Sequence, residues 1–415
     1  MKANKAKTIQ FLIICYPAME LLNGYIYKYE PTKIITNIYA IFFIVVAILT
    51  LIRSSIPATS VKKLLPLLLL VPLYLAILTA RDQLYFSDIS LFIRSIIFGM
   101  IAYLAMTTID RSELNSFVYR FCLSWWAITT CAIFSSAAFD IGLSTYEKFG
   151  IGNKFYFQAN NELAIFYSSI SAYLLTVKPR LMAKLAIATI SILCFLAIGT
   201  KSFIITAAII LTSSLIIKSN NRHKWNSLAI TLALSPLLVL ILSTQINLDK
   251  IATELIELLT AYSSGAIKIS EKVNHLGTIS ALLGERDILI SDAIETLSPK
   301  IGLIELFFGF GFTNYAQIYG NSLGQNFRFV ENDVVDIFFS FGLIGITGYL
   351  LLVGHGIKRF ITLQPTTNTH VTAASISYIN AILLGAISGH GVFFTLPCVV
   401  LAIFAATSIK RKNYA

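Results

Sequence analysis

Charged residues are scarce in this sequence of 415 residues. They make up 13% of the chain, hydrophobic residues make up 56%, and the mean hydropathy is +0.76. Soluble globular domains carry roughly 25% charged residues, so this chain has too little polar surface to cover itself in water. A bilayer removes that problem, because apolar side chains can then face outward. The composition therefore excludes an ordinary soluble domain and predicts a membrane protein.

Cysteine pairs and metal-binding motifs are also missing. The five histidines are far apart in the sequence, and there is no HExxH motif, so we expect no catalytic metal. The cysteines lie inside apolar runs and have the spacing neither of metal ligands nor of an extracellular disulfide framework. They are Cys15, Cys122, Cys131, Cys194 and Cys398.

Motifs of nucleotide-driven and hydrolytic chemistry are absent as well. Without a P-loop of the form GxxxxGK[ST], the chain itself is not expected to drive transport with ATP. There is no GxSxG nucleophile elbow and no pair of aspartates with DxD spacing to hold a metal-bound nucleotide sugar. We therefore expect no cofactor.

Long apolar runs are what the sequence does contain. A spanning helix needs about 20 mostly apolar residues, and the runs predict twelve spans. These are 9–26, 34–52, 64–80, 89–109, 121–139, 161–177, 184–199, 202–217, 227–243, 333–353, 371–388 and 391–409. The first run lacks a small-x-small cleavage site, so it is interpreted as an uncleaved helix and not as a signal peptide.

The basic residues give an independent test of this count. With the N-terminus inside, 19 of the 32 Lys and Arg residues fall in inward segments, whereas the short outward loops hold six. This alternation follows the positive-inside rule and explains the net charge of +11 without nucleic-acid binding, which we do not expect.

The sequence therefore predicts an all-α polytopic membrane protein of about 12 transmembrane helices, with both termini cytoplasmic. One large outward loop separates the ninth and tenth helices. The expected organisation is spans one to nine in residues 1–243, the loop in 244–332, and spans ten to twelve with a cytoplasmic tail in 333–415.

The large loop carries two patterns of amphipathic helices and ends in a polar cluster. Apolar residues recur at helical spacing over 251–259 and 289–306, which is typical of helices lying on a membrane surface. Glu331, Asn332, Asp333 and Asp336 then stand where the tenth span begins. Acidic groups cap helix N-termini, but Asp336 lies one turn into the span, where ionised side chains are costly and usually functional.

Outward cations accompany this carboxylate cluster. Lys201, Arg286 and Arg328 suit phosphate, because guanidinium groups bind it bidentately and ammonium groups act as point charges. A nearby carboxylate such as Glu331 can take a proton from an attacking hydroxyl. Arg94, in the fourth span, is a further candidate for substrate contact or for a structural ion pair. Cations and a base together are what group transfer from a diphosphate requires.

The order of four segments resembles the O-antigen ligase and Wzy-type polysaccharide polymerase family, over roughly residues 150–355. The first two are an asparagine-rich helix start, Gln158-Ala159-Asn160-Asn161-Glu162, and Gly199-Thr200-Lys201-Ser202, similar to the family's Ser-Arg-Gly element with Lys in place of Arg. The others are Arg286 followed by Phe308-Gly309-Phe310-Gly311-Phe312, and Glu331-Asn332 followed by Phe341-Gly342-Leu343-Ile344-Gly345.

This resemblance implies a metal-independent, GT-C-like glycosyltransferase of the bacterial inner membrane, with its active site on the periplasmic side. Its substrates would be undecaprenyl-diphosphate-linked oligosaccharides, and its partners the bilayer, a chain-length regulator and a flippase. Arg286 would bind the diphosphate with Lys201 and Arg328, and Glu331 would activate the acceptor hydroxyl. The predicted substrate-binding residues are Asn161, Asn332, Asp333, Asp336, Tyr315 and Arg94.

Three functions remain open from the sequence. Glu331 stands at the position of the ligases' histidine, which favours a repeat-unit polymerase for O-antigen, capsule or exopolysaccharide. An O-antigen ligase would use the same donor but transfer the glycan to lipid A-core. A polysaccharide flippase or secondary transporter is the alternative of a different class, although the chain shows no internal repeat.

Overall fold

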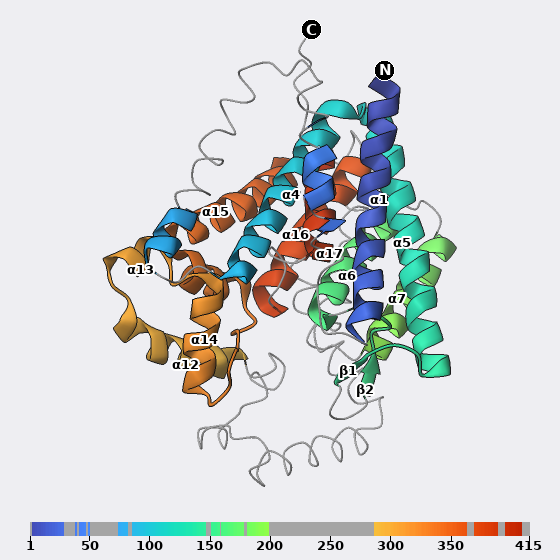
Figure 1. The fold of residues 1–415 in the computed structure, drawn as a ribbon. Coiled ribbons are helices and arrows are strands. Elements are labelled where there is room, and N and C mark those ends of the chain that lie inside the picture. Colours follow the sequence, from blue (N-terminus) through green and yellow to red (C-terminus); the bar gives the residue numbers. More distant parts are fainter. Residues whose placement is uncertain are drawn as a thin grey trace.

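A computed structural model of the chain describes most of the predicted spans and part of the outward loop. It covers residues 2–28, 38, 39, 41–46, 49, 74–81, 85–146, 151–157, 159–177, 181–198, 286–362, 369–388 and 395–408. The described chain is predominantly helical (Figure 1). Three of its helices are long and apolar enough to cross a membrane, over Lys5–Tyr27, Arg111–Phe139 and Asp333–Gly356.

The described chain also contains shorter helices and one β-hairpin. The elements of the helical bundle are α1 (Lys2–Tyr27), α4 (Phe86–Thr108), α5 (Arg111–Phe139), α6 (Asn160–Val177), α7 (Leu181–Ile198), α15 (Asp333–Thr362), α16 (Thr369–Ser388) and α17 (Thr395–Ser408). The hairpin pairs β1 (Ser144–Tyr146) with β2 (Ile151–Asn153) in antiparallel register. The prediction of an all-α fold did not include these two strands.

Helices lie in the predicted spans 9–26, 89–109, 121–139, 161–177, 184–199, 333–353, 371–388 and 391–409, so these helix predictions are confirmed. The largest difference is in α5, which begins ten residues before the predicted span because the polar turn Arg111–Asn115 is already helical. The predicted spans 34–52 and 64–80 are described only in part. Those at 202–217 and 227–243, like the predicted amphipathic helix at 251–259, lie outside the described residues.

Helix α16 occupies the interior of the bundle, against α6, α15 and α17. Small side chains allow the backbones to approach closely, as is typical of helix packing in membranes. On α16 these include Ala373, Ala374 and Ala381, all buried. Asn380 Nδ2 donates to Ser168 Oγ of α6 at 3.1 Å. The extensively packed pair of α6 and α16 is therefore also joined by a polar contact.

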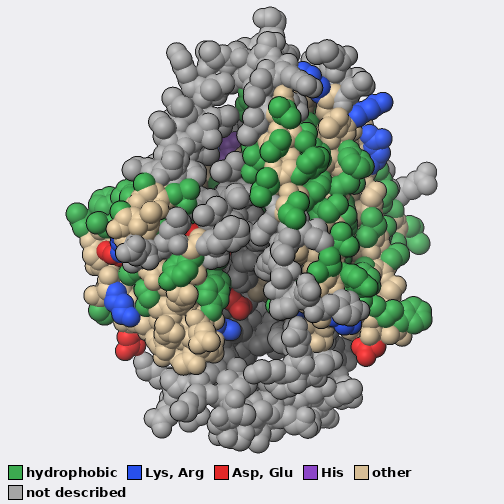
Figure 2. Space-filling view, viewed as in Figure 1, with side chains coloured by type: hydrophobic (Ala, Val, Ile, Leu, Met, Phe, Trp, Pro, Cys, Tyr) green, Lys and Arg blue, Asp and Glu red, His purple; other side chains and the backbone are tan. Residues whose placement is uncertain are grey.

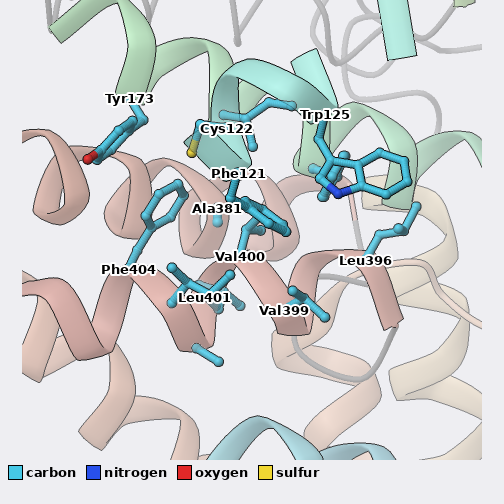
Figure 3. Close-up of a cluster of buried hydrophobic side chains, with 14 of the residues drawn as sticks. Phe121, Cys122, Trp125, Tyr173, Ala381, Leu396, Val399, Val400, Leu401 and Phe404 are labelled. Carbon is cyan, nitrogen blue, oxygen red and sulfur yellow. The ribbon is translucent and has the colours of Figure 1, made fainter. Parts of the chain in front are cut away.

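Larger side chains fill the space between α5, α6 and α17 (Figure 3). Trp125 of α5 and Phe404 of α17 project into this cluster, and Tyr173 of α6 stacks on Phe404 with ring centroids 5.5 Å apart. Helices α5 and α6 are joined again by the hydroxyl groups of Thr130 and Tyr167, which lie 2.7 Å apart. Apolar side chains of these helices are therefore buried by packing between the helices.

The two ends of the bundle differ in charge and in structure. Gln10 Nε2 of α1 donates to Glu113 Oε1 of α5 at 2.8 Å, so both helices begin at one end, together with the α4–α5 turn. Lys5, Lys7 and Arg111 lie at this end. The hairpin and the α12 and α14 helices of the loop lie toward the other end (Figure 1). The end at which α1 and α5 begin therefore carries these basic residues, whereas the hairpin and the loop helices mark the other end.

The described part of the large loop consists of α12 (Arg286–Leu297), a 3₁₀ turn over Ser298–Lys300, α13 (Leu303–Phe308) and α14 (Phe312–Ser322). The prediction of one continuous helix over 289–306 is wrong. Pro299 has no backbone N–H to continue the helix, and Gly302 is the extended N-cap of α13. The loop has its own apolar cluster, which includes Leu297, Tyr315 and Val330.

Helix α15 is broken at Gly342, where φ is 61° and ψ is −154°. A break leaves backbone carbonyls without helical partners, and such groups are costly inside a membrane. Here the N–H groups of Phe310 and Gly311 donate to the carbonyls of Phe339 and Ser340, at 2.8 and 3.1 Å. The loop therefore supplies hydrogen-bond donors to the carbonyl groups at the break, and these bonds fix the loop to α15.

Candidate functional site

The candidate site lies where the first turns of α14 meet the start of α15. Segment 325–332 connects the two helices and folds back along α14, because Arg328 N donates to Ala316 O at 2.9 Å and Gln325 N to Gly320 O at 2.8 Å. A Cβ atom at Gly320 would lie 2.8 Å from Phe327 N. The glycine is therefore required for this close approach.

Asp336 is the buried centre of the site, with 4% of its surface exposed. Its Oδ1 accepts the hydroxyl hydrogen of Tyr315 at 2.5 Å and the amide of Val330 at 3.2 Å. Its Oδ2 accepts the amide of Asn332 at 3.2 Å. Three donors thus compensate the negative charge, as a buried carboxylate requires.

Glu331 lies between the two amides that Asp336 holds. Its backbone is left-handed, with φ of 62°, which is uncommon for a residue other than glycine. Its carboxylate faces the guanidinium group of Arg328, and Oε1 lies 3.9 Å from Nη2. About a third of each side chain is exposed, 32% and 37% respectively. Arg328 and Glu331, three residues apart in the sequence, therefore form a partly accessible pair of opposite charges.

Asn332 and Asp333 begin α15. Asn332 Oδ1 accepts the amides of Val334 and Val335, at 3.1 and 3.2 Å, which is the geometry of a helix N-cap. Its Nδ2 donates to the carbonyl of Ala386 in α16 at 2.6 Å. Asp333 is the first helical residue and is buried. Acidic residues in this first turn are favoured by the helix dipole.

Tyr315 connects this helix start to the aromatic interior of the loop. Its ring lies 5.6 Å from that of Phe339 and 5.9 Å from that of Phe329, centroid to centroid. Burial raises the pKa of its phenol well above the usual range, and the charge of Asp336 raises the pKa further. The phenol therefore stays protonated and donates to Asp336.

Two contacts that the sequence did not predict attach the loop to the membrane helices. Asp88 in the first turn of α4 accepts the amide of Thr313 at 2.9 Å. Arg81, just before α4, forms an ion pair with Glu305 of α13. Asp88 stands three residues after Tyr85, the N-cap of α4, and this capping spacing was the available signal. Its partner could not be identified without the fold.

Two of the four segments on which the family resemblance rests meet in space. The Gly309–Gly311 segment lies against the Phe341–Gly342 break in α15, so that a Cβ atom at Gly342 would lie 2.5 Å from the Phe307 carbonyl carbon. These segments are about thirty residues apart in sequence. Their contact gives a structural reason for glycine in both.

The other predicted site residues are placed less completely. Arg286 is the first residue of α12 and Arg94 lies in α4, with both side chains outside the description. Asn161 is half-buried in the first turn of α6. Lys201 lies outside the described residues.

The face in Figure 2 is hollowed between the α12–α14 region and the rest of the bundle. Asp or Glu and Lys or Arg side chains lie together at the edge of this hollow, whereas hydrophobic side chains dominate the bundle surface beside it. Among the described residues, no three His, Cys, Asp or Glu side chains gather closely enough to hold a metal ion. The charged groups available there are suited to binding an anion and to moving a proton.

Comparison of the sequence with models of known protein families finds no match, and comparison with curated proteins finds none either.

Proposed function

We propose that this protein is a repeat-unit polymerase for O-antigen, capsule or exopolysaccharide. It transfers a growing glycan from undecaprenyl diphosphate to a hydroxyl group of the next lipid-linked unit. In this proposal twelve helices cross the bacterial inner membrane, both termini are cytoplasmic, and residues 244–332 form a periplasmic loop. The three long apolar helices and the basic end shared by α1 and α5 support this topology.

The observation that carries the proposal is the pair formed by Arg328 and Glu331 at the start of a membrane span. The pair belongs to the segment between α14 and α15, and α14 lies away from the N-termini of α1 and α5 in Figure 1. In the proposed topology the pair faces the periplasm at the depth of lipid headgroups, where the diphosphate of a lipid-linked donor is located.

The reaction needs a base and a stabilised leaving group. Glu331 takes the proton from the acceptor hydroxyl, whose oxygen forms a bond to the anomeric carbon of the donor glycan. The bond between that carbon and the diphosphate oxygen breaks, and the electron pair leaves with undecaprenyl diphosphate. Arg286, Lys201 and Arg328 stabilise the charge on this leaving group.

The donor's lipid tail remains in the bilayer while its sugar enters the site. The hollow beside the loop in Figure 2 supports such an arrangement, because its edge carries charged side chains next to an apolar surface. Asn161, Asn332, Asp333, Asp336, Tyr315 and Arg94 stay predictions as substrate-binding residues. A chain-length regulator and a flippase stay predictions as partners.

A glutamate in place of the ligases' histidine favours the polymerase over an O-antigen ligase. Transport is the remaining alternative. A transporter would be expected to carry several ionisable groups deep in its spans. Arg94 lies within α4, whereas Asp333 and Asp336 lie in the first turn of α15.

The test is complementation of a gene deletion in the host, with the surface glycan separated on a gel. A deletion that leaves one repeat on lipid A-core identifies the polymerase, and Glu331→Gln and Arg286→Ala should reproduce that pattern. Polymer that accumulates on undecaprenyl diphosphate without reaching lipid A-core would identify a ligase instead. An unchanged glycan would contradict both and favour transport.

Two matched substitutions in the same loop serve as controls. Glu295→Gln removes one carboxylate from an exposed position of α12, and Lys300→Ala removes one cation from the exposed turn that follows. Both should restore full-length glycan, provided that all variants are present in the membrane in equal amounts.

A further inference from the structure

Glu331 has an unfavourable backbone conformation. A φ of 62° is unfavourable for a residue other than glycine, because Cβ then lies too close to the following carbonyl oxygen. Such a conformation persists only when the surrounding structure imposes it, and it occurs preferentially at functional sites. The contacts that impose it at position 331 therefore indicate which residues control the direction of the Glu331 side chain.

The amides of both sequence neighbours of Glu331 are held by a single carboxylate. Asp336 accepts the amide of the residue before Glu331 and the amide of the residue after it, through different oxygens. Val330 N lies 3.2 Å from Oδ1 and Asn332 N lies 3.2 Å from Oδ2. Asn332 N belongs to the peptide plane that follows Glu331, whereas Val330 N belongs to the plane that precedes Val330. By holding both amides, the Asp336 carboxylate closes the chain from Val330 to Asn332 into a turn around Glu331 and limits the backbone rotations of Val330 and Glu331. The left-handed conformation of Glu331 lies within this turn.

Tyr315 joins the same network from the neighbouring helix. Its hydroxyl donates to Asp336 Oδ1 and accepts the amide of Val330 at 3.2 Å. Tyr315 and Val330 are fully buried. Hydrogen bonds in such a water-free environment are stronger than exposed ones. The carboxylate is thereby held in a fixed orientation between α14 and α15.

Arg328 is attached to the same support. Its amide donates to Ala316 O of α14, one residue after Tyr315. Downstream, Asn332 is fixed through Nδ2 to Ala386 of α16. Both members of the charged pair therefore extend from backbone that is tied to helices, although neither member is itself helical.

We propose that Asp336 is a positioning residue that holds the Glu331 carboxylate toward the acceptor hydroxyl through the amides of Val330 and Asn332. The proposal rests on the proposed function, in which Glu331 is the base. It assigns Asp336 and Tyr315 to the support of that base, and for these two residues it replaces the substrate contact that the sequence predicted. Asp336 is buried and already accepts three donors from its own chain, which is the geometric reason for this assignment.

Substitution of Asp336 by Asn tests the bridge with little change in shape. An amide has one acceptor oxygen, and its NH2 group would face the N–H of Val330 or Asn332, so one of the two bonds is lost. Tyr315→Phe removes the third donor and leaves both amide bonds to Asp336. Asp88→Asn is the matched control, because Asp88 is also a buried carboxylate that accepts a backbone amide, that of Thr313.

The full-length protein in lipid nanodiscs is assayed with the undecaprenyl-diphosphate-linked repeat extracted from a deletion strain. Misplacement of a reacting group by about 1 Å costs on the order of a hundredfold in rate, so kcat of Asp336→Asn should fall about that much, with KM within about twofold. Tyr315→Phe should show a smaller fall. Asp88→Asn should keep kcat within about twofold of wild type, whatever its loss of stability.

Hydrogen exchange, resolved to single amides by fragmentation mass spectrometry, measures the bridge without the reaction. The amides of Val330 and Asn332 should exchange faster in Asp336→Asn and at the wild-type rate in Asp88→Asn. Unchanged exchange and unchanged kcat in Asp336→Asn would overturn the proposal. If Asp336→Asn does not insert, the same two measurements on Tyr315→Phe decide, with faster exchange at Val330 expected.

Different results would refute the role of Glu331 as the base and the role of Asp336 as a positioning residue. Normal polymerisation by Glu331→Gln would refute Glu331 as the base and hence the catalytic part of this inference, even with faster exchange in Asp336→Asn. Loss of polymerisation in Glu331→Gln with wild-type kcat in Asp336→Asn would refute the positioning role and leave the proposed function standing.

Discussion

The hydroxyl group of Tyr315 lies 2.5 Å from Oδ1 of Asp336, which joins helix α14 of the large loop to the start of the membrane-spanning helix α15. The two residues are 21 positions apart in the sequence. The acceptor is a buried carboxyl group that also accepts the amides of Val330 and Asn332, so this bond belongs to a shared buried network.

Tyr315→Phe should destabilise the protein by about 2 kcal/mol, within the range for leaving a buried acceptor without one of its donors. The matched control is Tyr319→Phe in the same helix, where the lost bond goes to the carbonyl of Leu289 at 3.0 Å and is only partly buried. Thermal unfolding in detergent measures both. An equal or larger loss in Tyr319→Phe would contradict the larger contribution of the buried Tyr315 contact.

The break in α15 leads to a second prediction. Gly342→Ala should destabilise the protein by more than about 2 kcal/mol, because its φ and ψ values are accessible essentially only to glycine. The added Cβ would also meet the backbone of Phe307 at 2.5 Å. The measurement is thermal unfolding, together with the amount of protein inserted in the membrane.

Gly348 provides the control on the same helix. A Cβ atom at that position meets nothing within 4 Å, and alanine favours helix over glycine by about 1 kcal/mol. Gly348→Ala should therefore be neutral or stabilising. If the Gly342→Ala protein unfolded at the same temperature as the Gly348→Ala protein, a break of the helix at residue 342 would be contradicted.

The proposed topology predicts which residues can be labelled from outside the cytoplasmic membrane. In a variant whose native cysteines are replaced, Lys300→Cys should react with an impermeant maleimide once the reagent reaches the periplasm. Lys7→Cys, exposed at the start of α1, should react only after the inner membrane is made permeable. Labelling of both positions from the same side would contradict the assignment of the two ends of the bundle.

A further prediction concerns metal ions. Because the diphosphate charge is assigned to Arg286, Lys201 and Arg328, polymerisation by purified protein should keep its rate in excess EDTA. The substitution Arg328→Ala should reduce the rate in the same buffer. A rate that falls with EDTA and returns on addition of Mg²⁺ would contradict this assignment.

The sequence predicted the helices well because their signal is local. Apolar runs of sufficient length determine that a segment is helical in a bilayer, and α1, α6 and α16 begin and end within a few residues of the predictions, apart from the charged N-terminal turns of α1. Breaks were harder to predict. Glycine is frequent in transmembrane helices, so Gly342 was not distinguishable from Gly348 until the loop that packs against it was placed.

The sequence indicated a polar cluster at the start of the tenth span but not the arrangement of its members. The polar cluster at 331–336 stood out because acids at a span are costly. The roles within it depend on contacts at long range, such as Tyr315 with Asp336 and Asn332 with Ala386. The left-handed backbone of Glu331 has no signal in sequence, since the residue that would normally mark it is glycine.

The central claim is that the protein itself elongates a lipid-linked glycan. Its most direct test is to place the purified full-length chain in liposomes with a single undecaprenyl-diphosphate-linked repeat unit as the only substrate, and to separate the lipid-linked products by length. The account predicts a ladder of products that grow by one repeat, and no ladder with Glu331→Gln. Repeat units that remain single with wild-type protein, under conditions where the protein is folded and inserted, would contradict it.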